Sequence, residues 1–419
     1  MKTKIFKLLF IVIALLGFQQ VKAQQIPGID NDSVAIAIGS GFGGYYNSAL
    51  NQMPDSLRND LSKNEILKGV EYLFTLDSFK ESYMAGITIG RNMVSYIKTF
   101  NNSGLNINTQ IVVEEFYNSL ILDIPREEIS KYNNYIINFN YDSINSLNTD
   151  SLALCIGAVN GGILAGEINS LPDSIKHLYT KSSIFKSVEH ILNSDINNQS
   201  YLDGLSLGCS LYENIIYFEN KGLSINKKLV FDSFKTNFLK DSINQNEIEE
   251  FAYIISNTKD KIRNYELENS PEAIANKKAG KEFIANLKKS DKKIKTTSSG
   301  LSYKIIEKGN GNKVADQEIV KVAYKGSLID GTVFDDSNGE FREFPLDGVI
   351  PGFSEGLKLL NEGGKAILYI PGDLGYGLQG APAAGIGSNA TLIFEVEIFK
   401  PSTELIIEDD KIIIEEDMP

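Results

Sequence analysis

The sequence predicts a multi-domain protein. Two related all-α repeats and a linker helix should precede an α+β domain, whose bent antiparallel sheet wraps on one short helix. Three observations lead to this prediction. The chain has 419 residues, too many for one ordinary domain. Its N-terminal part matches itself at a shift of 118 residues. Seventeen of its 35 glycines lie between Gly300 and Gly387, where short β-rich segments replace the helical pattern.

The N-terminus has the parts of a cleaved secretory leader. Three lysines precede an apolar run from Leu8 to Phe18, which is too short to span a bilayer comfortably, and Val21-Lys22-Ala23 then supplies a cleavage site. We expect residues 1–23 to be a signal peptide cut after Ala23, and the mature protein to be periplasmic or secreted. A buried N-terminal helix is the alternative. No cysteine lies at the cleavage site that follows the apolar run, so a lipid anchor on the new N-terminus is not expected.

Charge and composition argue against nucleic acid and metal ions as ligands. Loss of the four leader lysines takes the net charge from −13 to −17, which would repel a phosphate backbone. The two cysteines and two histidines do not have the spacing of a metal site. Neither a metal, a cofactor nor a nucleic-acid partner is expected.

The internal repeat keeps its register over about ninety residues. The segment DSVAIAIGSGFGG from Asp32 aligns with DSLALCIGAVNGG from Asp150, and SYMAGITIG from Ser82 aligns with SYLDGLSLG from Ser200. We interpret residues 32–140 and 150–268 as two copies of one helical unit.

Glycines four residues apart recur in both copies. This spacing places both glycines on one helix face, where the missing side chains allow another helix to approach closely. A glycine inside a helix costs about 1 kcal/mol relative to alanine, so its repeated use there indicates packing. The pairs are Gly39/Gly43, Gly86/Gly90, Gly157/Gly161 and Gly204/Gly208.

The first glycine pair also satisfies a dinucleotide-binding pattern, G-x-G-x-x-G. That motif needs its middle glycine and a surrounding βαβ unit. The second copy has Val159 where the first has Gly41, while the four-apart glycines are kept. Helix packing is therefore the better interpretation.

A second motif, Gly352-Phe353-Ser354-Glu355-Gly356, satisfies the G-x-S-x-G pattern of a hydrolase nucleophile. Such a serine requires a histidine base, which follows it in chain order in that fold. The chain has only His177 and His190, both far upstream. Hydrolase chemistry is excluded.

The remaining chain divides into a linker helix, a β-rich domain and a tail. Ser270-Pro271-Glu272 is a good helix start, and an apolar stripe containing Ala275, Ala279 and Phe283 follows, so we expect a linker helix over residues 271–294. Residues 295–401 hold the β-rich segments and one short helix from Gly352. The acidic tail, residues 402–419, is either an added hairpin or a disordered end.

The β-rich domain resembles the FKBP-type peptidyl-prolyl cis-trans isomerases. The resemblance covers about a quarter of the chain in order and spacing, in the segments GLSYKIIEKGNG, VAYKGSLIDGTVFDDS, FPLDGVIPGFSEGL, EGGKAILYIPGDLGYG and NATLIFEVEI. The preceding ANKKAGKEFIANLKK and the helical copies are similar to the secreted branch related to macrophage infectivity potentiator. In that branch the helical unit occurs once and dimerises, whereas here it occurs in tandem.

The resemblance implies a non-covalent site for an Xaa-Pro bond. Asp335 would face the twisted amide and pair with Tyr324, the Ile350 amide would hold one substrate carbonyl, and the Tyr376 hydroxyl would hold another. The substrate-binding residues it implies are Phe334, Phe344, Val349, Phe353, Ile386 and Phe394.

Two departures from the family bear on rate and preference. Phe353 stands where the family usually has tryptophan, and Ile386 is followed by Gly387 and Ser388 instead of two prolines. We expect an isomerase (EC 5.2.1.8) that assists folding of exported proteins by binding their proline-containing segments. The alternative is a weakly active proline-segment-binding chaperone or a module that docks a partner.

Two further expectations concern the helical copies. They should pair within one chain as an internal pseudo-dimer, although a homodimer is also possible. Cys155 and Cys209 both lie in the second copy and either form a disulfide or stay free, and the alignment of Cys209 with Arg91 suggests an outward face.

Overall fold

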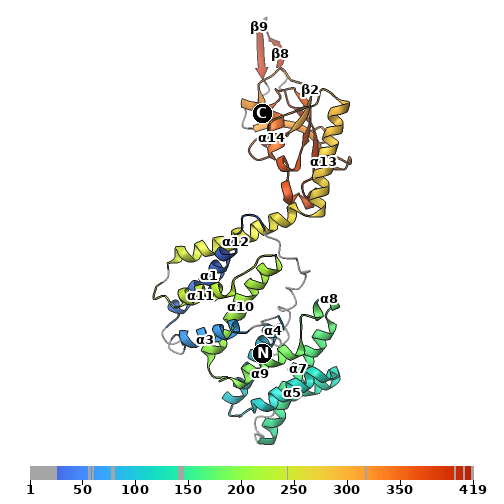
Figure 1. Ribbon diagram of the computed structural model, residues 1–419. Helices are drawn as coiled ribbons and strands as arrows, with labels where there is room; N and C mark the ends of the chain where they lie inside the picture. The colour runs from blue at the N-terminus through green and yellow to red at the C-terminus, as the bar shows by residue number, and fades with distance from the viewer. Residues whose placement is uncertain are drawn as a thin grey trace. The chain divides into compact units, whose positions relative to one another are not determined.

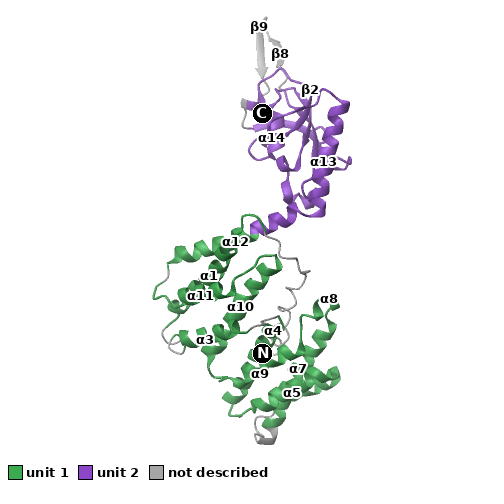
Figure 2. Ribbon diagram, in the orientation of Figure 1, with its two compact units in different colours: residues 1–259 green, residues 260–419 purple. Residues whose placement is uncertain are grey.

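The computed structural model describes residues 26–54, 58, 61–76, 81–139, 146–242, 244–316 and 319–400, with the backbone of two strands at 403–408 and 411–416 (Figure 1). The predicted signal peptide lies outside these residues. The chain divides into two compact units, Met1–Lys259 and Asp260–Pro419 (Figure 2), and each is described by itself.

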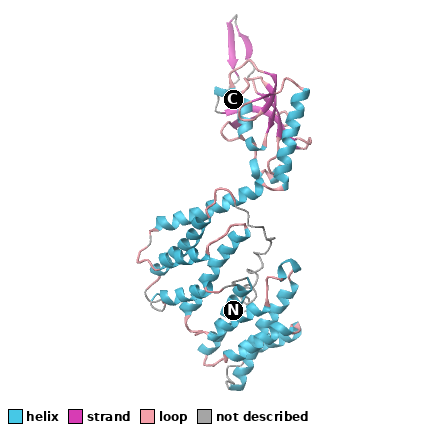
Figure 3. Ribbon diagram, viewed as in Figure 1, coloured by secondary structure: helices cyan, strands magenta, loops and turns pink. Residues whose placement is uncertain are grey.

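The first unit is helical among its described residues, as Figure 3 shows in cyan. The first copy contains α1 (Asn31–Gln52), α3 (Lys63–Phe74), α4 (Glu81–Asn102), α5 (Thr109–Leu122) and α6 (Arg126–Ile137). The second contains α7 (Ser146–Ser170), α8 (Asp173–Lys176), α9 (Lys181–Asn193), α10 (Gln199–Asn220), α11 (Lys227–Phe238) and α12 (Gln245–Glu268), which continues into the second unit.

The two copies repeat the same turn after their third long helix. Gly104 and Gly222 have φ values of +89° and +88°, a left-handed conformation that glycine adopts without a steric cost. Four residues later, the side chains of Asn108 and Asn226 cap α5 and α11 by accepting hydrogen bonds from backbone amides. The repeat in the sequence is therefore a repeat in local structure.

Each long helix of the first copy packs against a helix of the second. The pairs are α1 with α11, α3 with α10, α4 with α9, and α5 with α7. The arrangement is reciprocal: the first helix of each copy packs on the fourth long helix of the other, and the second packs on the third. The core of this unit is thus shared between the copies.

The four-apart glycines lie at these contacts, as predicted. A Cβ atom at Gly39 would lie 2.1 Å from the carbonyl oxygen of Val230, and one at the equivalent Gly157 would lie 2.4 Å from that of Val112. A Cβ at Gly204 would lie 2.0 Å from the carbonyl oxygen of Ile66. The helices therefore approach backbone to backbone, a distance that a larger residue would prevent.

Both cysteines are free and buried. Cys155 lies in α7 and Cys209 in α10. The expectation that Cys209 faces outward is wrong, because this position faces the other copy in both repeats: Arg91, its counterpart, pairs across the interface with Asp203 at 3.1 Å. Burial raises the pKa of Cys155 to about 11 and that of Cys209 to about 12, so both remain thiols at neutral pH.

One helical segment among the described residues, Thr149–Ser170, is long and apolar enough to cross a bilayer. It belongs to α7, and 67% of its most apolar window is buried inside the structure. Packing of α7 on α5 and α6 accounts for this composition, which is that of a core helix.

Among its described residues the second unit contains an antiparallel sheet, the end of α12, and the helices α13 (Pro271–Ser290) and α14 (Pro351–Lys358). The strand order is β1-β2-β6-β7-β3-β4, with β5 also paired to β3. The strands are β1 (Lys295–Thr296), β2 (Ser302–Glu307), β3 (Ile319–Leu328), β4 (Val333–Asp336), β5 (Arg342–Pro345), β6 (Lys365–Ile370) and β7 (Leu392–Ile398). With α14 packed against the sheet, this confirms the predicted fold class.

The linker helix expected over residues 271–294 is observed as α13, which ends at Ser290 and belongs to the second unit. The predicted linker helix α13 packs on the sheet: the rings of Phe283 and Tyr369 are 6.2 Å apart, and Asp291 just beyond the helix pairs with Lys304 at 2.7 Å. In the tail, β8 (Thr403–Glu408) and β9 (Lys411–Glu416) form an antiparallel hairpin, the first of the two alternatives.

Candidate active site

Tyr324 on β3 and Asp335 on β4 form the polar centre of the candidate site. The Tyr324 hydroxyl donates a hydrogen bond of 2.6 Å to Oδ2 of Asp335. Antiparallel pairing of β3 with β4 brings the two residues together, since Gly326 lies opposite Asp335. Burial, and then the bond to Asp335, raise the pKa of Tyr324 above its usual value, so its hydroxyl stays protonated and donates at neutral pH.

Four phenylalanines surround this pair in one aromatic cluster. The ring of Phe353, at the start of α14, is 4.8 Å from that of Phe394 on β7 and 6.0 Å from that of Tyr324. Phe344 on β5 makes an edge contact with Tyr324 at 5.7 Å. Phe334 on β4 makes one with Phe394 at 5.5 Å. These are the offset and edge geometries that aromatic rings prefer.

Gly326 makes room for this cluster. A Cβ atom there would lie 2.6 Å from the ring of Phe334 and 2.9 Å from that of Phe394. A glycine in the middle of a strand usually costs stability, so its use here reflects the space that the two rings require.

Val349 and Ile350 lead into α14 beside the cluster. Both are half-buried and pack against the core that contains Phe353. The Ile350 carbonyl accepts the first hydrogen bonds of the helix, from the amides of Phe353 and Ser354. The Ile350 amide has no acceptor among the described residues, which leaves it free to bind a ligand carbonyl.

Ile386 and Tyr376 come from the loop between β6 and β7. Ile386 is buried in the same core as the aromatic cluster. Tyr376 is 41% exposed, and its hydroxyl has no hydrogen-bond partner among the described residues. The structure thus brings together nine of the ten predicted site residues in one core and its edge, and leaves Tyr376 partly exposed on the loop that also carries Ile386.

Two residues that hold Tyr324 were missed in the sequence. The hydroxyl of Ser337, a fully buried residue, accepts from the Tyr324 amide at 2.9 Å. Arg342 donates to the Tyr324 hydroxyl at 3.4 Å, and its guanidinium lies 5.9 Å from the ring centroid. A single polar residue in or near a strand does not change the periodicity of the sequence. Its contact with Tyr324 could therefore be found only from the pairing of the strands.

Comparisons with known proteins identify the family of two segments of the chain. Residues 310–399 match the sequence profile of the FKBP-type peptidyl-prolyl cis-trans isomerases, and residues 196–305 match that of the domain amino terminal to FKBP-type peptidyl-prolyl isomerase. The second match covers part of the second helical copy, α13 and the beginning of the sheet.

Individual relatives extend over both regions. A probable FKBP-type peptidyl-prolyl cis-trans isomerase FkpA of Neisseria meningitidis is 37% identical over 209 residues, 49% of this chain and 75% of the relative. FkpA of Escherichia coli is 37% identical over 208 residues, with the same coverage. The crystal structure of FkpA from Escherichia coli aligns with 50% of this chain and 97% of its own, with a TM-score of 0.30. By its sequence, the chain belongs to the family of FKBP-type peptidyl-prolyl cis-trans isomerases.

Proposed function

We propose that the aromatic cluster around Tyr324 and Asp335 catalyses cis-trans isomerisation of Xaa-Pro bonds in unfolded exported proteins. The observation that carries this proposal is the convergence of five aromatic rings, a tyrosine–carboxylate pair and a free amide at the start of α14. The predicted leader supports a site of action in the periplasm or outside the cell.

The reaction needs no covalent step. Rotation about the bond passes through a twisted amide that has lost its resonance, at a barrier of about 18–20 kcal/mol, and uncatalysed exchange takes tens to hundreds of seconds. A site accelerates this exchange when it binds the twisted form more tightly than either planar form. Apolar walls suit the twisted amide because it is less dipolar than the planar one.

Each residue would then have a defined role. The proline ring would pack on the aromatic side chains of Phe353 and Phe394. The Ile350 amide and the Tyr376 hydroxyl would bind substrate carbonyls on either side of the bond, which fixes the chain while the prolyl amide rotates. Asp335, held by the Tyr324 hydroxyl, would face the twisted amide.

Variants of the mature full-length protein test this assignment. Asp335→Ala and Tyr376→Phe should each lower kcat/KM on a short Xaa-Pro peptide by roughly tenfold, the effect of about one hydrogen bond to a charged or buried group. Tyr253→Phe, which removes an exposed hydroxyl from the part of α12 that belongs to the first unit, is the matched control. Full activity in the double variant would contradict the site. Peptide binding without turnover in the unmodified protein would favour the alternative of a proline-segment-binding module.

We further propose that the helical unit is an internal pseudo-dimer. The reciprocal packing of the copies is what a two-fold interface requires, and two similar units in one chain can satisfy it. The connection through residues 140–145 makes the association intramolecular, with an effective concentration in the millimolar range.

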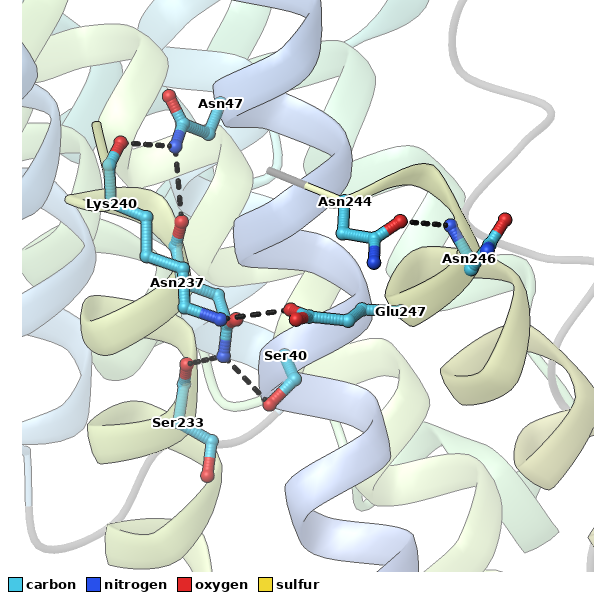
Figure 4. A network of polar contacts seen from close by, with 8 residues as sticks. All are labelled: Ser40, Asn47, Ser233, Asn237, Lys240, Asn244, Asn246 and Glu247. Carbon is cyan, nitrogen blue, oxygen red and sulfur yellow. Dashed lines mark hydrogen bonds and ion pairs between the residues drawn. The ribbon is translucent and has the colours of Figure 1, made fainter. Parts of the chain in front are cut away.

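A buried polar network supports pairing of unlike copies. Asn47 of α1 donates to the carbonyls of Asn237 and Lys240 at 3.1 and 2.8 Å, and Asn237 of α11 donates to the Ser40 hydroxyl at 2.9 Å (Figure 4). The equivalent positions of the other interface are Ala165, Ser119 and Ala158. If α11 packed instead on α7 of another second copy, Asn237 would keep its bond to the Ser233 carbonyl but lose the one to Ser40, and a buried N–H group left without an acceptor is costly.

A further inference from the structure

The helix α13 contacts the loop that carries Tyr376 and Ile386. Nδ2 of Asn276 donates a hydrogen bond of 2.8 Å to the Ser388 carbonyl. One turn later, a Cβ atom at the buried Gly280 would lie 2.0 Å from Oγ1 of Thr391, so the helix backbone approaches the loop there. One turn earlier, Glu272 lies beside Gly387. Positions 272, 276 and 280 form one face of α13.

The contact continues inside the loop to Tyr376. The Ser388 hydroxyl donates to the Leu378 carbonyl at 2.6 Å, and the amide of Asn389 donates to the Gly377 carbonyl at 2.8 Å. Ser388 and Asn389 are both buried. The Asn276 side chain therefore anchors the segment whose other hydrogen bonds hold the two residues directly after Tyr376.

The backbone of this loop is rich in glycine. Gly377, Gly380 and Gly385 all have positive φ, and Gly387 and Ser388 stand where the family usually has two prolines. Glycine has the greatest backbone freedom, whereas proline restricts the chain in both the folded and the unfolded state. The bond from Asn276 falls on the segment that lacks the prolines.

We propose that Asn276 is a positioning residue for the substrate-binding loop, residues 376–391, and that α13 thereby restrains a glycine-rich backbone. This inference rests on the proposed role of Tyr376 in binding substrate. It assigns α13 a part in the activity of the domain that it precedes.

Hydrogen exchange of the mature full-length protein tests the positioning directly. Asn276→Ala removes the side chain, and Asn276→Asp keeps its size but removes the donor. Asn286→Ala, an exposed asparagine on the same helix, is the matched control. The amides of Ala381, Ile386 and Asn389 should exchange roughly two- to tenfold faster in both Asn276 variants, the effect of one net hydrogen bond. Unchanged exchange in the folded Asn276→Asp variant would overturn the proposal.

A double-mutant cycle on kcat/KM separates positioning from a general loss of stability. The Asn276 variants should lower kcat/KM by roughly two- to tenfold in the unmodified protein and by less in a Tyr376→Phe background, where no hydroxyl remains to be positioned. An equal loss in both backgrounds would overturn the proposal. Normal activity of Tyr376→Phe would instead contradict the role proposed for Tyr376, and the exchange rates would still decide whether Asn276 holds the loop.

Discussion

Tyr324 is the residue on which the hydrogen bonds of the site converge. Its hydroxyl donates to Asp335 and accepts from Arg342, while its backbone amide and carbonyl both pair with Ser337. Its ring also contacts three phenylalanines of the cluster. A side chain held at both ends keeps the Asp335 carboxylate in place, as the proposed mechanism requires.

The protonation of the Tyr324 hydroxyl predicts the pH above which the activity falls. Burial and the bond to Asp335 raise the pKa of this tyrosine above its usual value of about 10, so the bond is intact below that pH and is lost as the pH rises through the raised pKa. We expect kcat/KM to stay level from about pH 7 to 9 and to fall only above about pH 10. Line-shape NMR on a proline peptide measures this profile.

Tyr324→Phe is the control for that profile. Its kcat/KM should be lower and its alkaline fall should be smaller, because no ionisable hydroxyl remains at this position while that of Tyr376 is still present. A fall beginning well below pH 10 in the unmodified protein, or the same step in the variant, would show that another group controls the activity.

Phe353 predicts an effect on ligand affinity. An indole is larger than a phenyl ring, and we expect Phe353→Trp to fill space in the cluster and raise affinity for family inhibitors or change substrate preference. Isothermal titration and thermal melting measure both properties. Phe341→Trp, in a ring pair with Phe399 apart from the cluster, should leave affinity unchanged.

Destabilisation of the domain by Phe353→Trp would contradict the role assigned to Phe353. Overpacking a filled core costs about 1–3 kcal/mol. If Phe353→Trp unfolds the domain while Phe341→Trp does not, the cluster is already filled around phenylalanine, and the role assigned to Phe353 is wrong.

At the scale of elements, the helix crossings depend on glycine. We predict that Gly39→Ala destabilises the helical unit by about 3 kcal/mol or more, because the new methyl group would overlap the Val230 carbonyl at the α1–α11 contact. Gly166→Ala in α7 is the control: nothing lies within 4 Å of its Cβ position, so the higher helix propensity of alanine should stabilise the protein by up to about 1 kcal/mol.

Urea denaturation of the two variants measures these free energies. Equal stability of Gly39→Ala and the unmodified protein would mean that α1 and α11 can separate at little cost. In that case the four-apart glycines would need an explanation other than close packing.

For the whole molecule, the internal pseudo-dimer predicts a monomer with one catalytic domain. Multi-angle light scattering on the mature protein should give the mass of a single chain over the micromolar range, because the tethered copies satisfy each other's interfaces. A stable species of twice that mass would show that each copy finds its partner in another chain.

The sequence by itself determined the order of the domains and most of the elements. The register of the repeat, the glycines four apart and the alternation of the β segments are local patterns, and local patterns specify helix faces and strands. The aromatic residues of the site were identified through the family resemblance, and their cluster follows from the order of the strands. The strands β4 and β5 have four residues each, which is too short for a periodic pattern in the sequence to identify them.

Only the tertiary structure decided which surfaces meet. Periodicity shows that one face of α1 is apolar, but it does not show that this face packs on α11 of the other copy instead of on a neighbour in the chain. For the same reason Cys209 seemed to face outward, although its position lies at the contact between copies. The sequence did not single out Asn276, because it is one polar residue among many on α13. Its role depends on the fold, which places its Nδ2 atom 2.8 Å from the Ser388 carbonyl oxygen. Contacts between distant segments depend on the whole chain, and so the sequence of either segment alone does not contain them.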